Sequence, residues 1–159
     1  MKSFLFYDVE TSGLNPAFDQ ILTFACIRTD LSLKEISREL ITIQLRRDIV
    51  PSPAAFLTHC LTPDELAMGV CEYAAAIQIH QLFNTPGTIS IGYNSLGFDD
   101  EFLRFLFYRN LLDPRAGTVL CIDRQSRRKG VHHPPRPRLR TGPCDGGGIL
   151  CPCHSGKKY

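Results

Sequence analysis

Two carboxylates, Asp8 and Glu10, stand at the end of an apolar stretch, SFLFYDVETSGL, at residues 3–14. In an extended strand, residues two positions apart project from the same face, so both acids point the same way. A buried carboxylate needs a cation, hydrogen bonds or a proton, and two together repel each other. A divalent metal meets both needs, and Mg²⁺ prefers oxygen ligands in a protein shell that leaves room for phosphate. The alternative is that the strand ends here and both acids reach water.

A second acidic group, Asp99, Asp100 and Glu101, follows a buried strand and opens a helix within GYNSLGFDDEF. Acids in a first helical turn also complement the helix dipole, which is the alternative interpretation. If the strand before Asp99 is a parallel neighbour of the first strand, Asp99 reaches the same sheet edge as the first two acids. Three carboxylates around one point would form a metal site.

The elements that must position these acids follow strand and helix patterns in turn. We predict strands at residues 3–10, 21–29, 39–45 and 88–93, and helices from Thr62, at 71–83 and at 98–111. The first three strands are close enough for an antiparallel meander. This order indicates an α/β domain with a mixed sheet.

The whole chain of 159 residues, 43% of them hydrophobic, suits one domain with a core. No apolar run approaches the ~20 residues that span a bilayer. The first residues lack the pattern of a signal peptide. We therefore expect a cytoplasmic protein without a membrane segment, whose seven cysteines are mostly reduced.

The net charge of +2 hides two very different segments. Residues 1–114 hold 8 Lys and Arg against 14 Asp and Glu, whereas residues 115–159 hold 10 against 2. The second segment also has 7 of the 12 glycines and a single aromatic, Tyr159. We predict a boundary near Pro114, followed by a disordered basic tail.

The motifs FYDVETSGL and GYNSLGFDDEFLRFLFYRNLLDP resemble the first two motifs of the DEDD 3′→5′ exonuclease superfamily, which includes polymerase proofreading domains. The resemblance is closer to the bacterial exonuclease I (exodeoxyribonuclease I) family. FLFYDVET, FACIRTD, LTPDE, IHQLFNTPGTISIGYN and FYRNLLDP follow its order and spacing. The resemblance covers residues 3–114 and implies a partial exonuclease domain with a ribonuclease-H-like mixed sheet and flanking helices, truncated where the tail begins.

The resemblance also implies a metal site that hydrolyses phosphodiester bonds. Two Mg²⁺ ions, for which Mn²⁺ can substitute, would lie on the catalytic acids Asp8, Glu10 and Asp99. Asp8 would bridge both ions, Glu10 would bind one, and Asp99 would bind the other side of the site. Asp100 and Glu101 would serve the start of the helix.

The implied substrate is single-stranded DNA, degraded from its 3′ end to mononucleotides in DNA repair. Residues implied to contact it are Thr11, Tyr93, Asn94 and Phe98, although Phe98 also suits core packing. The family further implies a monomer with single-stranded-DNA-binding protein as a partner.

The family's third motif, a histidine and an aspartate separated by four residues, has no good candidate. Only His59, with Asp64, has this spacing. That segment aligns with a turn before the family's first helix, so chance spacing explains it better. We therefore predict a chain with three of the four metal acids, no general base and impaired hydrolysis.

Residues 115–159 resemble nothing in the family. A frameshifted or truncated gene product would explain their composition, and a genuine basic tail that binds nucleic acid is the alternative. A zinc site on Cys144, Cys151, Cys153 and His154 is a third option, because CPCHSGKKY at residues 151–159 resembles the opening of the SEC-C zinc motif. That motif needs a second ligand pair, since tetrahedral zinc takes four ligands.

Two other functions stay open beside an exonuclease I-like enzyme. One is a non-catalytic nucleic-acid-binding fragment, which the basic tail would favour. The other is a proofreading or oligoribonuclease-type member of the superfamily, against which FACIRTD and FYRNLLDP argue.

Overall fold

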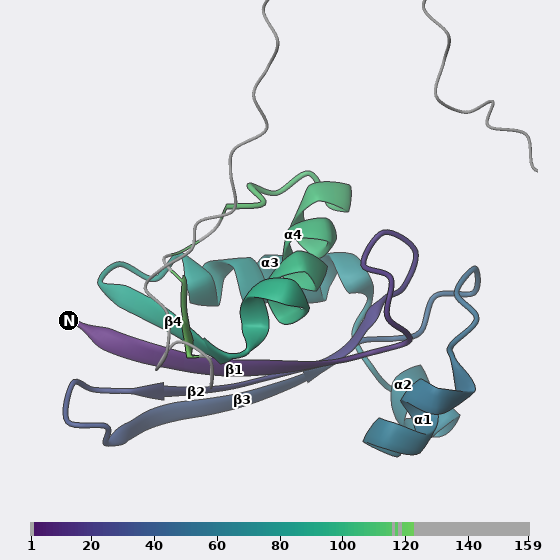
Figure 1. Cartoon of the computed structure of the whole chain (residues 1–159), viewed down its shortest axis with the longest axis horizontal. Coiled ribbons are helices and arrows are strands. Elements are labelled where there is room, and N and C mark those ends of the chain that lie inside the picture. The colour runs from purple at the N-terminus through teal and green to yellow at the C-terminus, as the bar shows by residue number, and fades with distance from the viewer. Residues whose placement is uncertain (1, 116, 118, 123–159) are drawn as a thin grey trace, which may run out of the picture. The chain divides into compact units, whose positions relative to one another are not determined.

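A five-stranded mixed sheet organises the computed structural model, which describes residues 2–115, 117 and 119–122 (Figure 1). The strands are β1 (Ser3–Thr11), β2 (Ile21–Thr29), β3 (Glu35–Thr42), β4 (Thr88–Tyr93) and β5 (Val119–Ile122). The helices are α1 (Pro53–His59), α2 (Pro63–Ala67), α3 (Glu72–Phe83) and α4 (Asp99–Arg109), with a 3₁₀ turn, η1 (Ser95–Gly97), before α4.

The strands lie in the order β3-β2-β1-β4-β5. β1, β2 and β3 form an antiparallel meander, which confirms the arrangement predicted from their short connections. β4 then pairs with the other side of β1 in parallel, and β5 continues in parallel beside β4. The predicted α/β domain with a mixed sheet is confirmed, and β1 and β4 are the parallel neighbours on which the metal-site prediction depends.

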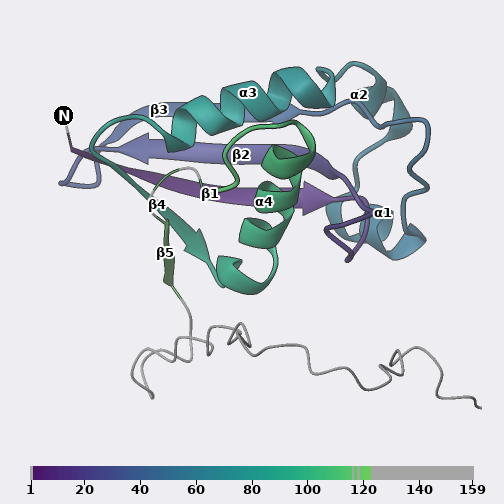
Figure 2. The ribbon, with the colours of Figure 1, turned by 90° about the horizontal axis from the view of Figure 1, so that it is seen from above.

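Helices α3 and α4 pack over one face of this sheet (Figure 2). Alternate residues of β1 point into the layer between sheet and helices, because successive side chains of a strand face opposite sides. The core on this face includes Leu5, Tyr7, Val9, Phe24, Ile79, Phe83, Phe102 and Leu106. The acids Asp8 and Glu10 alternate with these core residues and face the other side.

The connection between β3 and α3 contains two short helices. Thr62 is the N-cap of α2, as predicted, with a capping box in which the Thr62 hydroxyl accepts from the Glu65 N–H and the Glu65 carboxylate accepts from the Thr62 N–H. Sequence reasoning missed α1, whose seven residues bury no side chain and so show no apolar periodicity. Among the described helices, none is long and apolar enough to cross a membrane.

β1 extends one residue beyond its predicted end, to Thr11, and two other strands differ more. β3 covers Glu35–Thr42 rather than residues 39–45, because most side chains of this edge strand are exposed and only Ile41 is buried. β5 lies in the segment where we predicted no regular structure, and for these four residues that prediction was wrong. Backbone pairing with β4, a contact between distant parts of the chain, forms a strand too short to show a period of its own. The remaining predictions on the tail, from residue 123 on, lie outside the described residues.

Candidate active site

The parallel pairing of β1 and β4 brings the start of α4 to the end of β1. β4 ends at Tyr93, η1 turns the chain, and Asp99 is the first residue of α4. The Asp99 Oδ1 atom accepts a hydrogen bond from the backbone N–H of Val9, at 3.3 Å. Asp99 therefore contacts β1 at the residue between Asp8 and Glu10.

Burial makes the Asp99 carboxyl unusual. Its residue is only 8% exposed. Burial raises the pKa of Asp99 to about 6, and the nearby negative charge of Asp8 adds to the rise. Hydrogen bonds from backbone N–H groups, including that of Val9, act in the opposite direction. Asp99 consequently holds a proton more readily than an ordinary aspartate does.

Asp8 and Glu10 stand in different surroundings. Asp8 is exposed and Glu10 is half-buried. Neither carboxylate forms a hydrogen bond or ion pair with any residue in the described part of the chain. Within residues 2–115, 117 and 119–122, no three His, Cys, Asp or Glu side chains converge closely enough to hold a metal ion. The structure thus brings Asp99 near Asp8, and it does not gather Glu10 with them into one cluster.

A hydrogen-bonded group in the core fixes the start of α4. The Tyr7 hydroxyl donates to Asp100 Oδ1, and its oxygen lies 3.3 Å from Ser95 Oγ. Ser95 Oγ in turn donates to Asp100 Oδ2 at 3.3 Å. Burial raises the pKa of Tyr7 well above its usual value, and the hydrogen bond to Asp100 adds to this. Sequence analysis assigned Asp100 to the helix start but missed Tyr7, whose place in an apolar strand gave no sign of a polar partner.

Gly92 makes this group possible. A Cβ atom at Gly92 would lie 2.4 Å from the side chain of Ser95. A larger residue here would push η1 away from β4, and with it the start of α4.

The four predicted substrate contacts differ in accessibility. Tyr93 and Asn94 are exposed beside η1, and Asn94 adopts a left-handed backbone with φ 54°. Thr11 is buried and its hydroxyl donates to the Gly13 carbonyl at 2.7 Å. Phe98 is half-buried, with its ring centroid 4.9 Å from that of Phe102, so the core-packing alternative describes at least part of its role.

His59 has local partners only. Its Nδ1 atom accepts from the Leu61 N–H at 3.0 Å, and its ring packs edge-on against Phe56. Asp64 lies in the first turn of α2. The described contacts of His59 are therefore local, and none of them is with Asp64.

Comparisons with known proteins agree with this geometry. The sequence model of a family described as exonuclease matches residues 5–124, ten residues beyond the boundary expected at Pro114. Exodeoxyribonuclease I of Escherichia coli (strain K12) is 45% identical over 117 residues, which are 72% of this chain and 25% of that protein. The Haemophilus influenzae enzyme of the same name is 38% identical over 114 residues, covering 70% and 24%. The chain thus spans about a quarter of the length of these curated relatives.

Solved structures give the same result for the fold. E. coli exonuclease I in complex with a dT13 oligonucleotide superposes with a TM-score of 0.72 and 39% identity, covering 76% of this chain and 28% of that one. A complex of ExoI with SSB-Ct superposes with a TM-score of 0.73, at the same identity and coverage. The predicted ribonuclease-H-like fold, with helices flanking a mixed sheet, is confirmed by these superpositions.

Proposed function

This chain belongs to the exonuclease family, and we propose that it is part of a 3′→5′ exodeoxyribonuclease that hydrolyses single-stranded DNA. The observation that carries the proposal is the contact between Asp99 and the Val9 amide. It brings a buried acid from α4 to the strand that carries Asp8 and Glu10.

The relatives support the choice of substrate. Solved structures of E. coli exonuclease I that this chain resembles hold dT13 and dA16 oligonucleotides. Exposed Tyr93 lies just before η1 and exposed Leu96 lies within it, next to the acidic edge, where bases of a single strand would stack. The complex of ExoI with SSB-Ct makes single-stranded-DNA-binding protein a second proposed partner.

The three acids suit a divalent cation. They offer only oxygen ligands, which Mg²⁺ and Mn²⁺ prefer. Asp8 and Glu10 have no other partner in the described part of the chain, and Asp99 Oδ1 accepts from the Val9 N–H. Asp8, Glu10 and Asp99 are the residues that would hold two such ions. When bound, such a pair stabilises both the attacking and the leaving oxygen of a phosphodiester.

Neighbouring residues orient the Asp99 side chain and the first turn of α4. The Val9 N–H orients the Asp99 carboxylate, and Asp99 must release its proton before it can bind a cation. Tyr7 and Asp100 hold the first turn of α4 in place.

We predict that this chain hydrolyses DNA weakly. His59 and Asp64 are its only pair with the spacing of the third motif, and their contacts are local. Loss of a positioned general base typically lowers a rate by ~10²–10⁴-fold.

The test separates metal binding from hydrolysis. Mn²⁺ binding is measured by calorimetry, and hydrolysis with 3′-labelled single-stranded DNA and Mg²⁺, for the wild type, Asp8→Ala and Glu35→Gln. Glu35 is an exposed carboxylate on β3 and serves as the control. Asp8→Ala should weaken Mn²⁺ binding and abolish any residual hydrolysis, while Glu35→Gln should change neither. Mn²⁺ binding that survives Asp8→Ala would refute the site, and robust hydrolysis by the wild type would refute the prediction of impaired activity. A wild type that binds single-stranded DNA without any cleavage would favour the non-catalytic alternative.

A further inference from the structure

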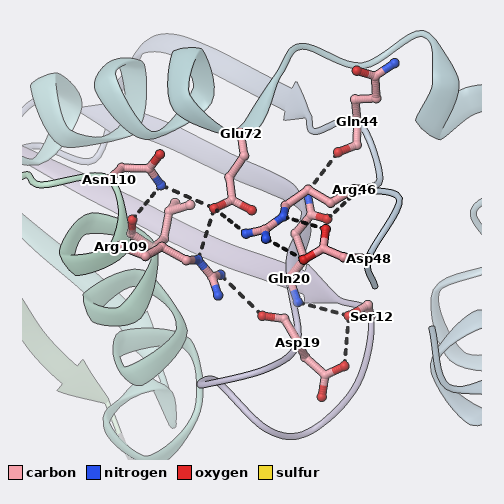
Figure 3. A network of polar contacts seen from close by, with 10 residues as sticks. Ser12, Asp19, Gln20, Gln44, Arg46, Asp48, Glu72, Arg109 and Asn110 are labelled. Carbon is pink, nitrogen blue, oxygen red and sulfur yellow. Dashed lines mark hydrogen bonds and ion pairs between the residues drawn. The ribbon is translucent and has the colours of Figure 1, made fainter. Parts of the chain in front are cut away.

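A buried ion pair joins α3 to α4 at the ends where their dipoles favour it (Figure 3). Glu72 is the first residue of α3 and Arg109 the last of α4. Arg109 Nε lies 3.0 Å from Glu72 Oε1, and the Glu72 side chain is only 9% exposed. An acid at a helix N-terminus and a base at a C-terminus are each favourable. The pair therefore fixes the two helices at one point.

The same carboxylate oxygen gathers further donors. Asn110 Nδ2 donates to Glu72 Oε1 at 3.3 Å, and a terminal guanidinium nitrogen of Arg46 lies 3.7 Å from it. Arg46 is also paired with Asp48. Replacing Glu72 with a neutral residue would thus leave Arg109 and Arg46 without the charge that holds them together.

This network also includes the loop between β1 and β2, residues 12–20, and the segment that follows β3 (Figure 3). Arg109 donates to the Asp19 carbonyl at 3.3 Å. The fully buried Gln20 side chain accepts from the Arg46 N–H at 3.0 Å and donates to the Gln44 carbonyl at 2.9 Å. The loop is therefore attached to α3, to α4 and to the chain that follows β3.

The loop is also ordered from within. The Asp19 carboxylate accepts from the Ser12 hydroxyl at 3.0 Å and from the Asn15 N–H at 2.9 Å. A Cβ atom on Gly13 would lie 2.5 Å from that carboxylate. Two large apolar side chains nevertheless stay in solvent, Leu14 at 84% and Phe18 at 76% exposure.

We infer that Glu72 and Arg109 are positioning residues, which hold the β1–β2 loop so that exposed Leu14 and Phe18 can contact the bases of a single DNA strand. This rests on the proposed function, because the loop directly follows the strand with Asp8 and Glu10. Apolar and aromatic side chains bind single-stranded bases without regard to sequence. A loop ordered in advance loses less conformational freedom on binding, so affinity depends on the network behind it.

The test uses the full chain with two variants and one control. Glu72→Gln removes the charge. Arg109→Lys keeps a positive charge, but one ammonium group cannot hold both Glu72 and the Asp19 carbonyl as the two guanidinium nitrogens do. Glu35→Gln makes the same chemical change in the exposed pair with Arg38.

Three quantities are measured for each chain. Hydrogen exchange reports the amides of Phe18 and Asp19, which both donate to the Asn15 carbonyl. Fluorescence anisotropy with a labelled oligo-dT in Ca²⁺ reports strand affinity, and calorimetry reports Mn²⁺ affinity. In Glu72→Gln and Arg109→Lys we expect loop exchange and the oligo-dT dissociation constant each to be about tenfold higher, the effect of weakening one ion pair that is largely shielded from water. Mn²⁺ affinity should stay within about twofold, and the Glu35→Gln control should match the wild type.

The outcomes separate this inference from the proposed function. If Glu72→Gln does not fold, Arg109→Lys decides. Unchanged hydrogen exchange of the loop in the folded variants overturns the positioning role. Exchange that rises equally in the loop and in the central strands also overturns it, because the whole fold is then destabilised. Unchanged oligo-dT affinity with a loosened loop overturns the role of the loop in binding. A wild type that binds no oligo-dT refutes the proposed function, and the exchange data then still decide whether the ion pair positions the loop.

Discussion

Replacing Asp99 with Asn should make the metal-free protein more stable at pH 8 while abolishing its response to metal. Asp99 is buried beside Asp8, and its pKa is raised from 3.8 to about 6. Folding therefore places a carboxylate where the neutral form is favoured. Asparagine is neutral and of similar size, and its side-chain oxygen can still accept from the Val9 N–H.

The sign and size of the effect follow from linkage between protonation and folding. Below a pH of about 3.8 the carboxyl is protonated in both states, and Asp99 does not lower stability. Between pH 3.8 and about 6 the unfolded chain releases this proton while the folded protein keeps it, so the free energy of unfolding falls as the pH rises. Above pH 6 Asp99 is ionised in both states, and the loss of stability is complete. A pKa difference of this size corresponds to about 3 kcal/mol at most, and screening by nearby water reduces it to about 1–2 kcal/mol.

One opposing effect remains. The helix dipole stabilises a carboxylate in the first turn of α4 by about 0.3–1 kcal/mol, and the neutral Asn side chain lacks this stabilisation. The net gain for Asp99→Asn at pH 8 is then about 1 kcal/mol, or a rise in Tm of roughly 2–5 °C for a domain of this size. At pH 4 the gain should vanish.

The assay is thermal unfolding in EDTA at pH 4 and pH 8, followed by the same measurement at pH 8 with Mn²⁺. The control is Asp113→Asn, an exposed carboxylate outside the candidate site, which should leave Tm unchanged throughout. Mn²⁺ should raise the Tm of the wild type but not of Asp99→Asn, because bound ligand stabilises only a fold that contains its site. The reasoning is refuted if Asp99→Asn is no more stable than the wild type at pH 8, or if its gain is the same at both pH values.

Three further changes test the parts around Asp99. Tyr7→Phe should lower the free energy of unfolding by about 1–3 kcal/mol in urea, because it removes the donor to Asp100 Oδ1, and an unchanged midpoint would contradict the contact. Gly92→Ala should destabilise the fold by at least about 1 kcal/mol, since the new Cβ would lie 2.4 Å from Ser95, whereas Gly97→Ala, with open space around it, is the control and should cost less. Thr62→Ala should lower stability by about 0.5–2 kcal/mol through the lost capping box, and Thr58→Ala, an exposed threonine inside α1, should have the smaller effect if the cap is responsible.

The sequence was most informative where one face of an element is buried. β2 and β4 match the predicted residue ranges, and α3 differs by one residue, because their apolar patterns reflect burial against the core. α1 and β5 escaped prediction for the opposite reason. α1 buries no side chain, and β5 is a four-residue strand that depends on β4. The approach of Asp99 to β1 was predictable because parallel neighbouring strands end at one edge of a sheet.

The division of roles between Asp99 and Asp100 could not be predicted in full. Consecutive residues of a helix point about 100° apart, so two neighbouring acids in one first turn face different surroundings. Asp100 turns to the core and bonds to Tyr7, while Asp99 turns to β1 and accepts from the Val9 N–H. The spacing in the sequence does not tell which of the two acids faces the core. The position of Tyr7 in the folded core decides it, because Tyr7 bonds to Asp100. The hydrogen bond between Asp100 and Tyr7 stabilises the start of α4. This stabilisation offsets the cost of burying the Asp99 carboxylate in the same helical turn.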